Sequence, residues 1–245
     1  GDFRFNVIVI EELAKIGASG PGFAVHSDIV APYLINYSSD TQKKEYLPKM
    51  VKGEIITAIA MTEPGTGSDL QNIKTKATVK ENNIILNGSK TFITNGQNAN
   101  LVLVVAKTDS TKKAKGISIV LCEDYRKGFE KGKNLKKIGM QAQDTSELFF
   151  HDVELPIENI LGQSGQGFGQ LMDELPQERL SIAVTAIAAA ESALDWTISY
   201  TKERTAFSTK IIDFQNTKFT LAKLKSELSV ACLLYTSDAA DDNAG

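Results

Sequence analysis

The sequence has 245 residues, of which 42% are hydrophobic and 23% charged, with a formal net charge of -3. This length permits one large domain or two small ones, and more than one hydrophobic core. The slightly acidic balance argues against a nucleic-acid groove or an anionic membrane surface, because both favour a basic protein face. Two lysine clusters, in residues 112–115 and 131–137, are therefore interpreted as solvated loops.

Cysteine and histidine are scarce. Cys122 and Cys232 are the only cysteines and cannot build a disulfide framework, which favours a reducing compartment. His26 and His151 are not spaced as metal ligands, so no metal site is predicted. We also expect no membrane span and no secretory signal, because no apolar run reaches the roughly 18 residues that a span requires.

The first third of the chain has helical patterns. They cover residues 5–16 and 22–37, which are separated by the breaker GASGPG. A third helix is predicted after Ser39, because Ser39 and Gln42 have the spacing of a capping box and Gly53 marks an end. These segments predict an N-terminal helical domain over residues 1–55.

From about Ile55 the pattern changes to short β-branched runs separated by turn residues. The predicted strands cover residues 55–61, 75–80, 83–88, 90–96, 100–107, 116–123 and 146–156. The pairs Asn87-Gly88 and Asn95-Gly96 are read as hairpin turns between strands. The pattern predicts a middle antiparallel β-barrel or sandwich domain over residues 56–160.

Helical periodicity returns after LGQSGQGFGQ, residues 161–170, which we interpret as a hinge because it does not match the dinucleotide-binding pattern GxGxxG. One helix of about six turns is expected from its apolar stripe of Leu180, Val184, Ile187, Leu194 and Ile198. A second helix follows from Phe214 to about Val230. We predict an incomplete C-terminal helical bundle over residues 161–230 and interpret residues 231–245 as a non-native tail. The fold class is therefore α+β and multidomain.

The stretch TEPGTGSD, residues 62–69, is the first candidate site. Gly65 and Gly67 permit backbone angles that direct N–H groups toward one point, and Thr62 and Ser68 add hydroxyls. The stretch lacks the lysine of a nucleotide P-loop, so a triphosphate is not the expected ligand. It fits a loop that binds a diphosphate or a ring oxygen, and it equally fits an ordinary Pro-Gly turn.

Glu178 in the stretch MDELPQERL is the second candidate. Pro176 is expected to start or kink a helix, which would place Glu178 in a first turn beside Leu175, Leu180 and Ile182. A carboxylate against apolar walls is suited to act as a general base, because desolvation raises its pKa. The alternative is a surface glutamate favoured by the helix dipole. No GxSxG motif supports serine hydrolysis.

Five motifs occur in a characteristic order: AMTEPGTGSDL, NGSKTFITNG, AQDTSELFFHDVELP, ELPQERL, and YTKERTAF followed by FQ. In this order and spacing the chain resembles the acyl-CoA dehydrogenases from near its start to about Ser229. SGPGFAVHSDIV and ELPQERL are most similar to the long-chain branch. The resemblance implies a helical, β, helical subunit with FAD between the β domain and the C-terminal helices. The chain is expected to lack both ends of that subunit.

The resemblance also implies which residues bind FAD: Met61, Thr62, Gly67, Ser68, Phe92, Ile93, Thr94, Arg204, Phe207 and Gln215. Phe92 stands where many relatives carry tryptophan, a change that keeps the stacking face and loses an N–H. Arg204, Phe207 and Gln215 match positions that reach the FAD of a neighbouring subunit, with Arg204 pairing with its diphosphate. A homodimer or homotetramer is therefore expected.

Glu178 immediately precedes Arg179, as the catalytic base does in the long-chain and isovaleryl branches. The resemblance makes Ser68, Pro176, Gln177, Glu178 and Arg179 substrate contacts, with Arg179 near the nucleotide end of CoA. The implied reaction is FAD-dependent α,β-dehydrogenation of long-chain or branched-chain acyl-CoA thioesters to trans-2-enoyl-CoA. Electrons would pass to an electron-transfer flavoprotein. The expected location is the cytoplasm of a bacterium or the mitochondrial matrix of a eukaryote.

Two alternatives remain open at this point. An acyl-CoA oxidase-like flavoenzyme would use O₂ and form peroxide rapidly in air. A catalytically inert fragment or binding module of the same fold would show no measurable effect of Glu178→Gln.

Overall fold

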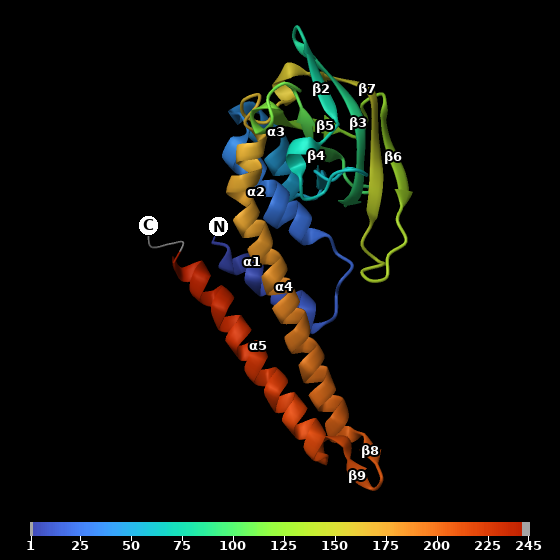
Figure 1. The fold of residues 1–245 in the computed structure, drawn as a ribbon, viewed down its shortest axis with the longest axis vertical. Helices are drawn as coiled ribbons and strands as arrows, with labels where there is room; N and C mark the ends of the chain where they lie inside the picture. Colours follow the sequence, from blue (N-terminus) through green and yellow to red (C-terminus); the bar gives the residue numbers. More distant parts are fainter. Residues whose placement is uncertain (1, 242–245) are drawn as a thin grey trace. The chain divides into compact units, whose positions relative to one another are not determined.

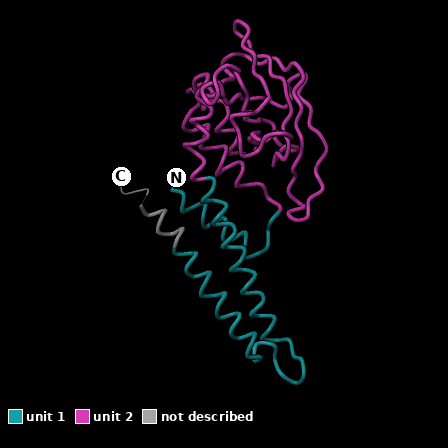
Figure 2. The backbone as a smooth tube through the Cα atoms, in the orientation of Figure 1, with its two compact units in different colours: residues 1–19, 178–245 teal, residues 20–177 magenta. Residues whose placement is uncertain are grey.

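The chain divides into two compact units, which are described separately below. The structure is a computed structural model that describes the backbone of residues 2–241 and the side chains of residues 2–233. Figure 2 shows one unit made of residues 1–19 and 178–245, called unit 1, and another made of residues 20–177, called unit 2. Residues 242–245 of the predicted tail lie outside the described residues.

Unit 2 begins with short helices. A π-helix, η1 (Val25–Val30), leads into α2 (Ala31–Tyr37), and α3 (Asp40–Val51) follows. The predicted capping box of α3 is confirmed, since the Gln42 backbone N–H donates to Ser39 Oγ over 3.2 Å and the Ser39 N–H donates to Gln42 Oε1 over 2.9 Å. Gly53, with a φ of +71°, lies just beyond the end of α3.

A seven-stranded sheet forms the rest of the core of unit 2 (Figure 1). Its strands are β1 (Thr57–Ala60), β2 (Lys76–Lys80), β3 (Asn83–Thr94), β4 (Leu101–Lys107), β5 (Ile117–Glu123), β6 (Phe129–Asn134) and β7 (Thr145–Pro156). The spatial order is β1-β4-β2-β3-β7-β6, with β5 also pairing with β4. Most pairs are antiparallel, as predicted, but β1 joins β4 in parallel and β2 touches β4 in parallel at one residue pair. Two short 3₁₀ turns, η2 (Leu70–Asn72) and η3 (Ala114–Gly116), lie between strands, and a third, η4 (Ile157–Asn159), follows β7 and precedes α4.

Strand β4 is buried on both faces, which explains its unbroken apolar run. Val102 and Val104 pack in one core with residues of β3 and β7. Leu103 and Val105, on the opposite face, pack in a second core with residues of α2 and α3. The sheet therefore folds over the first core, and the helices cover its outer face. This arrangement confirms the predicted fold class.

The Asn87-Gly88 hairpin predicted from the sequence is wrong, because β3 runs through this pair without a turn. The Asn87 side chain donates to Asp152 Oδ1 and accepts from the Asp152 backbone N–H, each over 2.9 Å. Asp152 has a φ of +50° beside a register shift between β3 and β7. Asn87 thus stabilises the irregular backbone of β7 at Asp152. The amide side chain that suggested a turn at Asn87 makes these two hydrogen bonds instead. Asn95, with a φ of +63°, does lie in a turn after the end of β3, but the strands on either side, β3 and β4, do not pair with each other, so this turn is not a hairpin.

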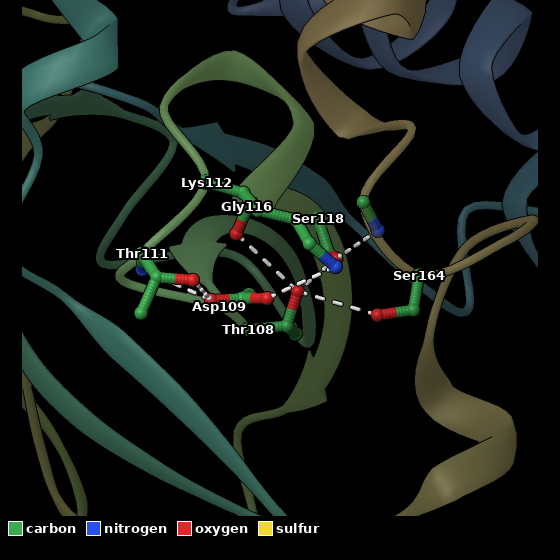
Figure 3. Close-up of polar contacts among 8 residues, drawn as sticks. Thr108, Asp109, Thr111, Lys112, Gly116, Ser118 and Ser164 are labelled. Carbon is green, nitrogen blue, oxygen red and sulfur yellow. Dashed lines mark hydrogen bonds and ion pairs between the residues drawn. The ribbon is translucent and has the colours of Figure 1, made fainter.

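The glycine-rich segment 161–170 is fastened to the β4–β5 connection, so it differs from the predicted hinge. Thr108 Oγ1 lies 2.7 Å from Ser118 Oγ, Ser164 Oγ donates to Thr108 Oγ1, and the Gly165 N–H donates to Ser118 Oγ over 2.8 Å (Figure 3). A Cβ at Gly167 would lie 2.7 Å from the Ser118 backbone. Glycine is needed there for close packing.

In its described residues, 2–19 and 178–241, unit 1 consists of helices and one hairpin. It consists of α1 (Arg4–Lys15), the part of α4 (Gly167–Glu203) from residue 178 onward, a hairpin of β8 (Thr205–Ala206) and β9 (Thr209–Lys210), the 3₁₀ turn η5 (Ile211–Asp213), and α5 (Gln215–Asp241). Ile10 of α1 packs with Val184 and Ala188 of α4. Three of the five residues of the predicted stripe, Leu180, Val184 and Ile187, thus belong to this core. No helix in the described part of the chain is long and apolar enough to cross a membrane.

Candidate functional site

Two of the predicted FAD-binding segments lie side by side in unit 2. The first follows β1 and contains Met61 and Thr62, and the second is the end of β3. The Thr91 backbone N–H donates to Thr62 O over 2.9 Å, and Lys90 Nζ donates to Met61 O over 2.9 Å. Segments about thirty residues apart in the sequence are thereby joined at their backbones. We call residues 61–68 the glycine loop.

A β-bulge in β3 makes this junction possible. Lys90 pairs with Leu148 and Ile93 with Ser146, so three steps along β3 correspond to two along β7. The extra residue allows the Thr91 N–H to bind the glycine loop. Phe92 has a φ of +59° and is 67% exposed, whereas Ile93 is buried. Bulges beside functional sites redirect side chains in this way, and a left-handed backbone costs a bulky residue roughly 1–2 kcal/mol.

The glycine loop offers hydrogen-bond donors that the rest of the protein does not use. Glu63 and Thr66 exchange two backbone hydrogen bonds, of 2.8 and 3.0 Å, which form a tight turn. Within residues 2–233, no protein acceptor is found for the backbone N–H groups of Thr62, Gly67 and Ser68. A Cβ added at Gly67 would meet no atom within 4 Å. The loop therefore presents free donors beside open space, as a site for ring or phosphate oxygens would.

A buried ion pair anchors the glycine loop. Lys90 Nζ lies 3.0 Å from Glu63 Oε1, and their side chains are 0% and 6% exposed. Glu63 also accepts from the backbone N–H groups of Lys74, over 2.6 Å, and Thr75, over 2.9 Å. Burial lowers the pKa of Lys90 to about 8 although Glu63 opposes the shift. Burial raises the pKa of Glu63, but Lys90 and the N–H donors outweigh it, so that pKa lies below its usual value.

The predicted position of Glu178 in a first helical turn is wrong. Helix α4 begins at Gly167 and has 37 residues, so Pro176 and Glu178 lie inside it. The Gln170 N–H donates to Gln166 O over 3.1 Å, which starts the helix before the proline. Glu178 is half-buried and Arg179 is exposed. Of the two expected roles of Pro176, starting or kinking a helix, the first is wrong, because Pro176 lies in the interior of α4.

The other predicted substrate contacts in this region belong to unit 2. Pro176 is exposed, while Gln177 Nε2 donates to Asp28 O over 3.2 Å. Asp28 lies in η1 and is 8% exposed, and burial raises the pKa of its carboxyl to about 6. A pocket of about 360 Å³ nearby is lined by Tyr37, Lys115 and the first turn of α4. It contains none of the predicted site residues.

Unit 1 holds the remaining predicted residues on its surface. Arg204 follows the last residue of α4, Phe207 lies at the tip of the β8–β9 hairpin, and Gln215 is the first residue of α5; all three are exposed. Phe207 is 93% exposed and has a φ of +51°, and Ser208 has a φ of +59°. Two successive left-handed residues normally call for Asn or Gly. An exposed aromatic residue on a strained turn is typical of a contact site.

Comparison with known proteins relates the whole chain to one family. The N-terminal, middle and C-terminal domain profiles of acyl-CoA dehydrogenases match residues 1–54, 58–153 and 165–244. The chain is 50% identical over 232 residues to the mitochondrial long-chain specific acyl-CoA dehydrogenase of Sus scrofa, covering 94% of this chain and 54% of the relative. The chain belongs to the acyl-CoA dehydrogenase family.

Other relatives support this assignment. Mitochondrial isovaleryl-CoA dehydrogenase of Bos taurus is 40% identical over 97% of this chain and 56% of its own length. The acyl-CoA dehydrogenase structure from Geobacillus kaustophilus is 45% identical, with a TM-score of 0.94 over 98% of this chain and 65% of that one. The structure of butyryl-CoA dehydrogenase from Megasphaera elsdenii is 35% identical, with a TM-score of 0.93 over 99% of this chain and 64% of that one. The chain spans about half the length of the curated relatives it matches.

The observed geometry of unit 2 fits the flavin that this family uses. The free N–H groups of Thr62, Gly67 and Ser68 suit the oxygens and nitrogens of a flavin ring, and the exposed face of Phe92 suits its planar surface. Unit 2 joins the glycine loop to the bulge at the end of β3, where Phe92, Ile93 and Thr94 lie. Glu178, Arg179, Arg204, Phe207 and Gln215 belong to unit 1.

Sequence reasoning missed the anchoring pair of Glu63 and Lys90. Glu63 lies in the motif AMTEPGTGSDL and Lys90 in NGSKTFITNG, but the sequence predicted no function for either residue. A signal was present, because Lys90 has the same strand parity as the buried residues Ile84 and Leu86. A lysine on the inward face of a strand is rare without a buried partner. The partner itself could be found only from the fold.

Proposed function

We propose that this chain carries the FAD-dependent α,β-dehydrogenation of acyl-CoA thioesters to trans-2-enoyl-CoA. The observation that supports this most strongly is the glycine loop docked on the β3 bulge. There, unused backbone donors and an exposed, strained Phe92 lie in adjoining segments. Neither feature helps unit 2 to fold, so both are best explained by a bound planar group.

In this proposal the glycine loop and the end of β3 hold FAD. Thr62, Gly67 and Ser68 donate to it, and Phe92 and Thr94 lie beside its ring. FAD, when bound, supplies the acceptor for the hydride that leaves the β-carbon of the substrate.

Glu178 is the proposed catalytic base. Its carboxylate takes the α-proton of the thioester, and the electron pair of that C–H bond becomes part of the new double bond. The carboxylate form is required, so activity needs Glu178 ionised before the proton moves. Ser68, Pro176, Gln177 and Arg179 are the proposed substrate contacts, with Arg179 facing the nucleotide part of CoA.

The preferred substrate class is a long-chain acyl-CoA. The mitochondrial long-chain specific relatives from Sus scrofa and Mus musculus are 50% and 49% identical, against 40% for isovaleryl-CoA dehydrogenase of Bos taurus. A branched acyl group is the alternative outcome of the substrate test below.

A homodimer or homotetramer is proposed from the geometry of α4. Twenty-five residues separate Glu178 from Glu203, the last residue of α4, which at 1.5 Å per residue is about 37 Å. Arg204 and Phe207 are thus far along the helix from Glu178 and are suited to a neighbouring subunit's FAD. An electron-transfer flavoprotein is the proposed electron acceptor, and the mitochondrial names of the relatives favour the matrix if the source is eukaryotic.

The test is an anaerobic titration of the FAD-loaded protein with acyl-CoAs of increasing length and with isovaleryl-CoA. We expect the oxidised flavin band to bleach, most readily with long chains. Glu178→Gln should abolish bleaching and leave FAD affinity unchanged, whereas the matched control Glu203→Gln, on the same helix, should bleach normally. Equal bleaching in both variants would contradict the role of Glu178. Rapid peroxide formation in air would indicate an oxidase instead.

A further inference from the structure

The buried pair of Glu63 and Lys90 connects three separate segments. Lys90 comes from β3, Glu63 from the glycine loop, and the N–H groups of Lys74 and Thr75 from the chain leading into β2. All four hydrogen bonds of this group, including that from Lys90 Nζ to Met61 O, are between 2.6 and 3.0 Å. Lys90 Nζ thus uses two of its three N–H groups, and both carboxylate oxygens of Glu63 accept hydrogen bonds, although the pair is almost completely out of water.

Burying such a pair is an inefficient way to stabilise a fold. Desolvation of two charges offsets most of their attraction, so apolar residues of similar volume often serve as well or better. The pair instead fixes the orientation of the backbone around Thr62. Lys90 binds the carbonyl just before Thr62, and Glu63 is the residue just after it. Both ends of the Thr62 peptide are thus fixed relative to β3.

The free donors of the glycine loop depend on this arrangement. The Thr62 carbonyl accepts from the Thr91 N–H over 2.9 Å, which directs the Thr62 carbonyl at the bulge. Among the described residues, that bond is the one other hydrogen bond between the first half of the glycine loop, residues 61–64, and β3.

We propose that Lys90 and Glu63 are positioning residues for the flavin site, which align the donors of the glycine loop with Phe92 at the β3 bulge. The proposal rests on the proposed function, because it names the flavin as the group to be aligned. The two residues need not touch FAD. They act through the backbone of residues 61–63.

The test compares the full chain with Lys90→Met, with Glu63→Gln and with the double variant. Lys90→Met alone leaves a buried, unpaired carboxylate and is expected to destabilise the fold. The double variant removes both charges and is expected to recover the unfolding midpoint in urea. Lys80→Met, on the exposed surface of β2, is the matched control.

Two readouts separate positioning from simple stability. In the double variant we expect FAD to bind about tenfold more weakly, the loss of one aligned hydrogen bond. Hydrogen exchange at the Thr91 backbone amide can be measured without FAD. In the double variant we expect this amide to exchange about tenfold faster than in the parent at matched global stability. A conserved urea midpoint with both changes supports the proposal.

The opposite results are equally clear. A double variant that regains the unfolding midpoint and also keeps native FAD affinity and native Thr91 exchange would overturn the proposal and make the pair merely structural. If the parent chain binds no FAD, the proposed function fails. Faster Thr91 exchange in the double variant would then still show that the pair orders the loop, and unchanged exchange would refute that too.

Discussion

Phe92 carries the clearest conflict between local preference and observed structure. A bulky side chain with a φ of +59° and an exposed ring stabilises neither the strand nor the core. Its backbone geometry is nonetheless what turns Thr91 toward the glycine loop. In the proposed function, the residue is explained by the flavin ring that it would contact rather than by folding.

Replacing Phe92 with Asn should therefore separate stability from binding. Asn tolerates the left-handed region, so Phe92→Asn is expected to keep the free energy of unfolding or raise it by up to about 1 kcal/mol. FAD affinity should fall, because the stacking face is lost. Urea unfolding and a flavin fluorescence titration give the two values. A loss of stability above about 1 kcal/mol would show that the ring packs in the fold.

Asp28 should make stability depend on pH. Burial raises its pKa from the ordinary aspartate value of 3.8 to about 6, so between those values the folded state binds more protons than the unfolded state. Its contribution to stability is complete below about pH 4 and is lost as the pH rises through 6. At about 1.4 kcal/mol per pKa unit, Asp28→Asn should raise the free energy of unfolding at pH 7 by about 2–3 kcal/mol.

The measurement is urea unfolding between pH 4 and 7. Asp28→Asn should flatten the curve relative to the parent, and the exposed residue Asp195, changed to Asn, serves as the control and should not. Parallel curves for the parent and Asp28→Asn would show that this carboxyl does not titrate between pH 4 and 6.

At the scale of elements, the β8–β9 hairpin is the part of unit 1 with the clearest local strain. Its two turn residues, Phe207 and Ser208, both have positive φ. Replacing them together with Asn-Gly, the favoured pair for this turn, should raise the free energy of unfolding by about 1–2 kcal/mol. The same change should weaken FAD binding in the assembled oligomer, because the proposed aromatic contact is removed. If both stability and FAD affinity stay at the parent values, the turn is neither strained nor a contact.

Local signals predicted several elements correctly. The capping box of Ser39 and Gln42 depends only on residues close together in the sequence, and α3 begins at Asp40, directly after Ser39. β6 was missed because FEKGKN, residues 129–134, lacks β-branched residues and gains its place only by pairing with β7. The Asn87-Gly88 turn was wrong for the opposite reason, since a strong local signal was overruled by pairing with β7.

At the scale of the molecule, the order of helical, β and helical parts could be predicted, because each has its own periodicity and the motifs occur in family order. The parallel pairing of β1 with β4 could not, since strand partners far apart in the chain leave no local pattern. The same holds for the candidate site. Its residues were named by resemblance, but the bulge, the unused donors and the Glu63–Lys90 pair are properties of the folded chain. The proposed domain limits and the non-native tail remain predictions.

The proposed reaction begins with removal of the substrate α-proton by Glu178, and exchange of that proton with solvent measures this step. The FAD-loaded protein is incubated anaerobically with a long-chain acyl-CoA in D₂O, and deuterium at the α-carbon is measured by mass spectrometry. The parent and the Glu203→Gln control should catalyse exchange, and Glu178→Gln should reduce it to the uncatalysed rate. Exchange at the parent rate in Glu178→Gln would contradict the account and place the base elsewhere.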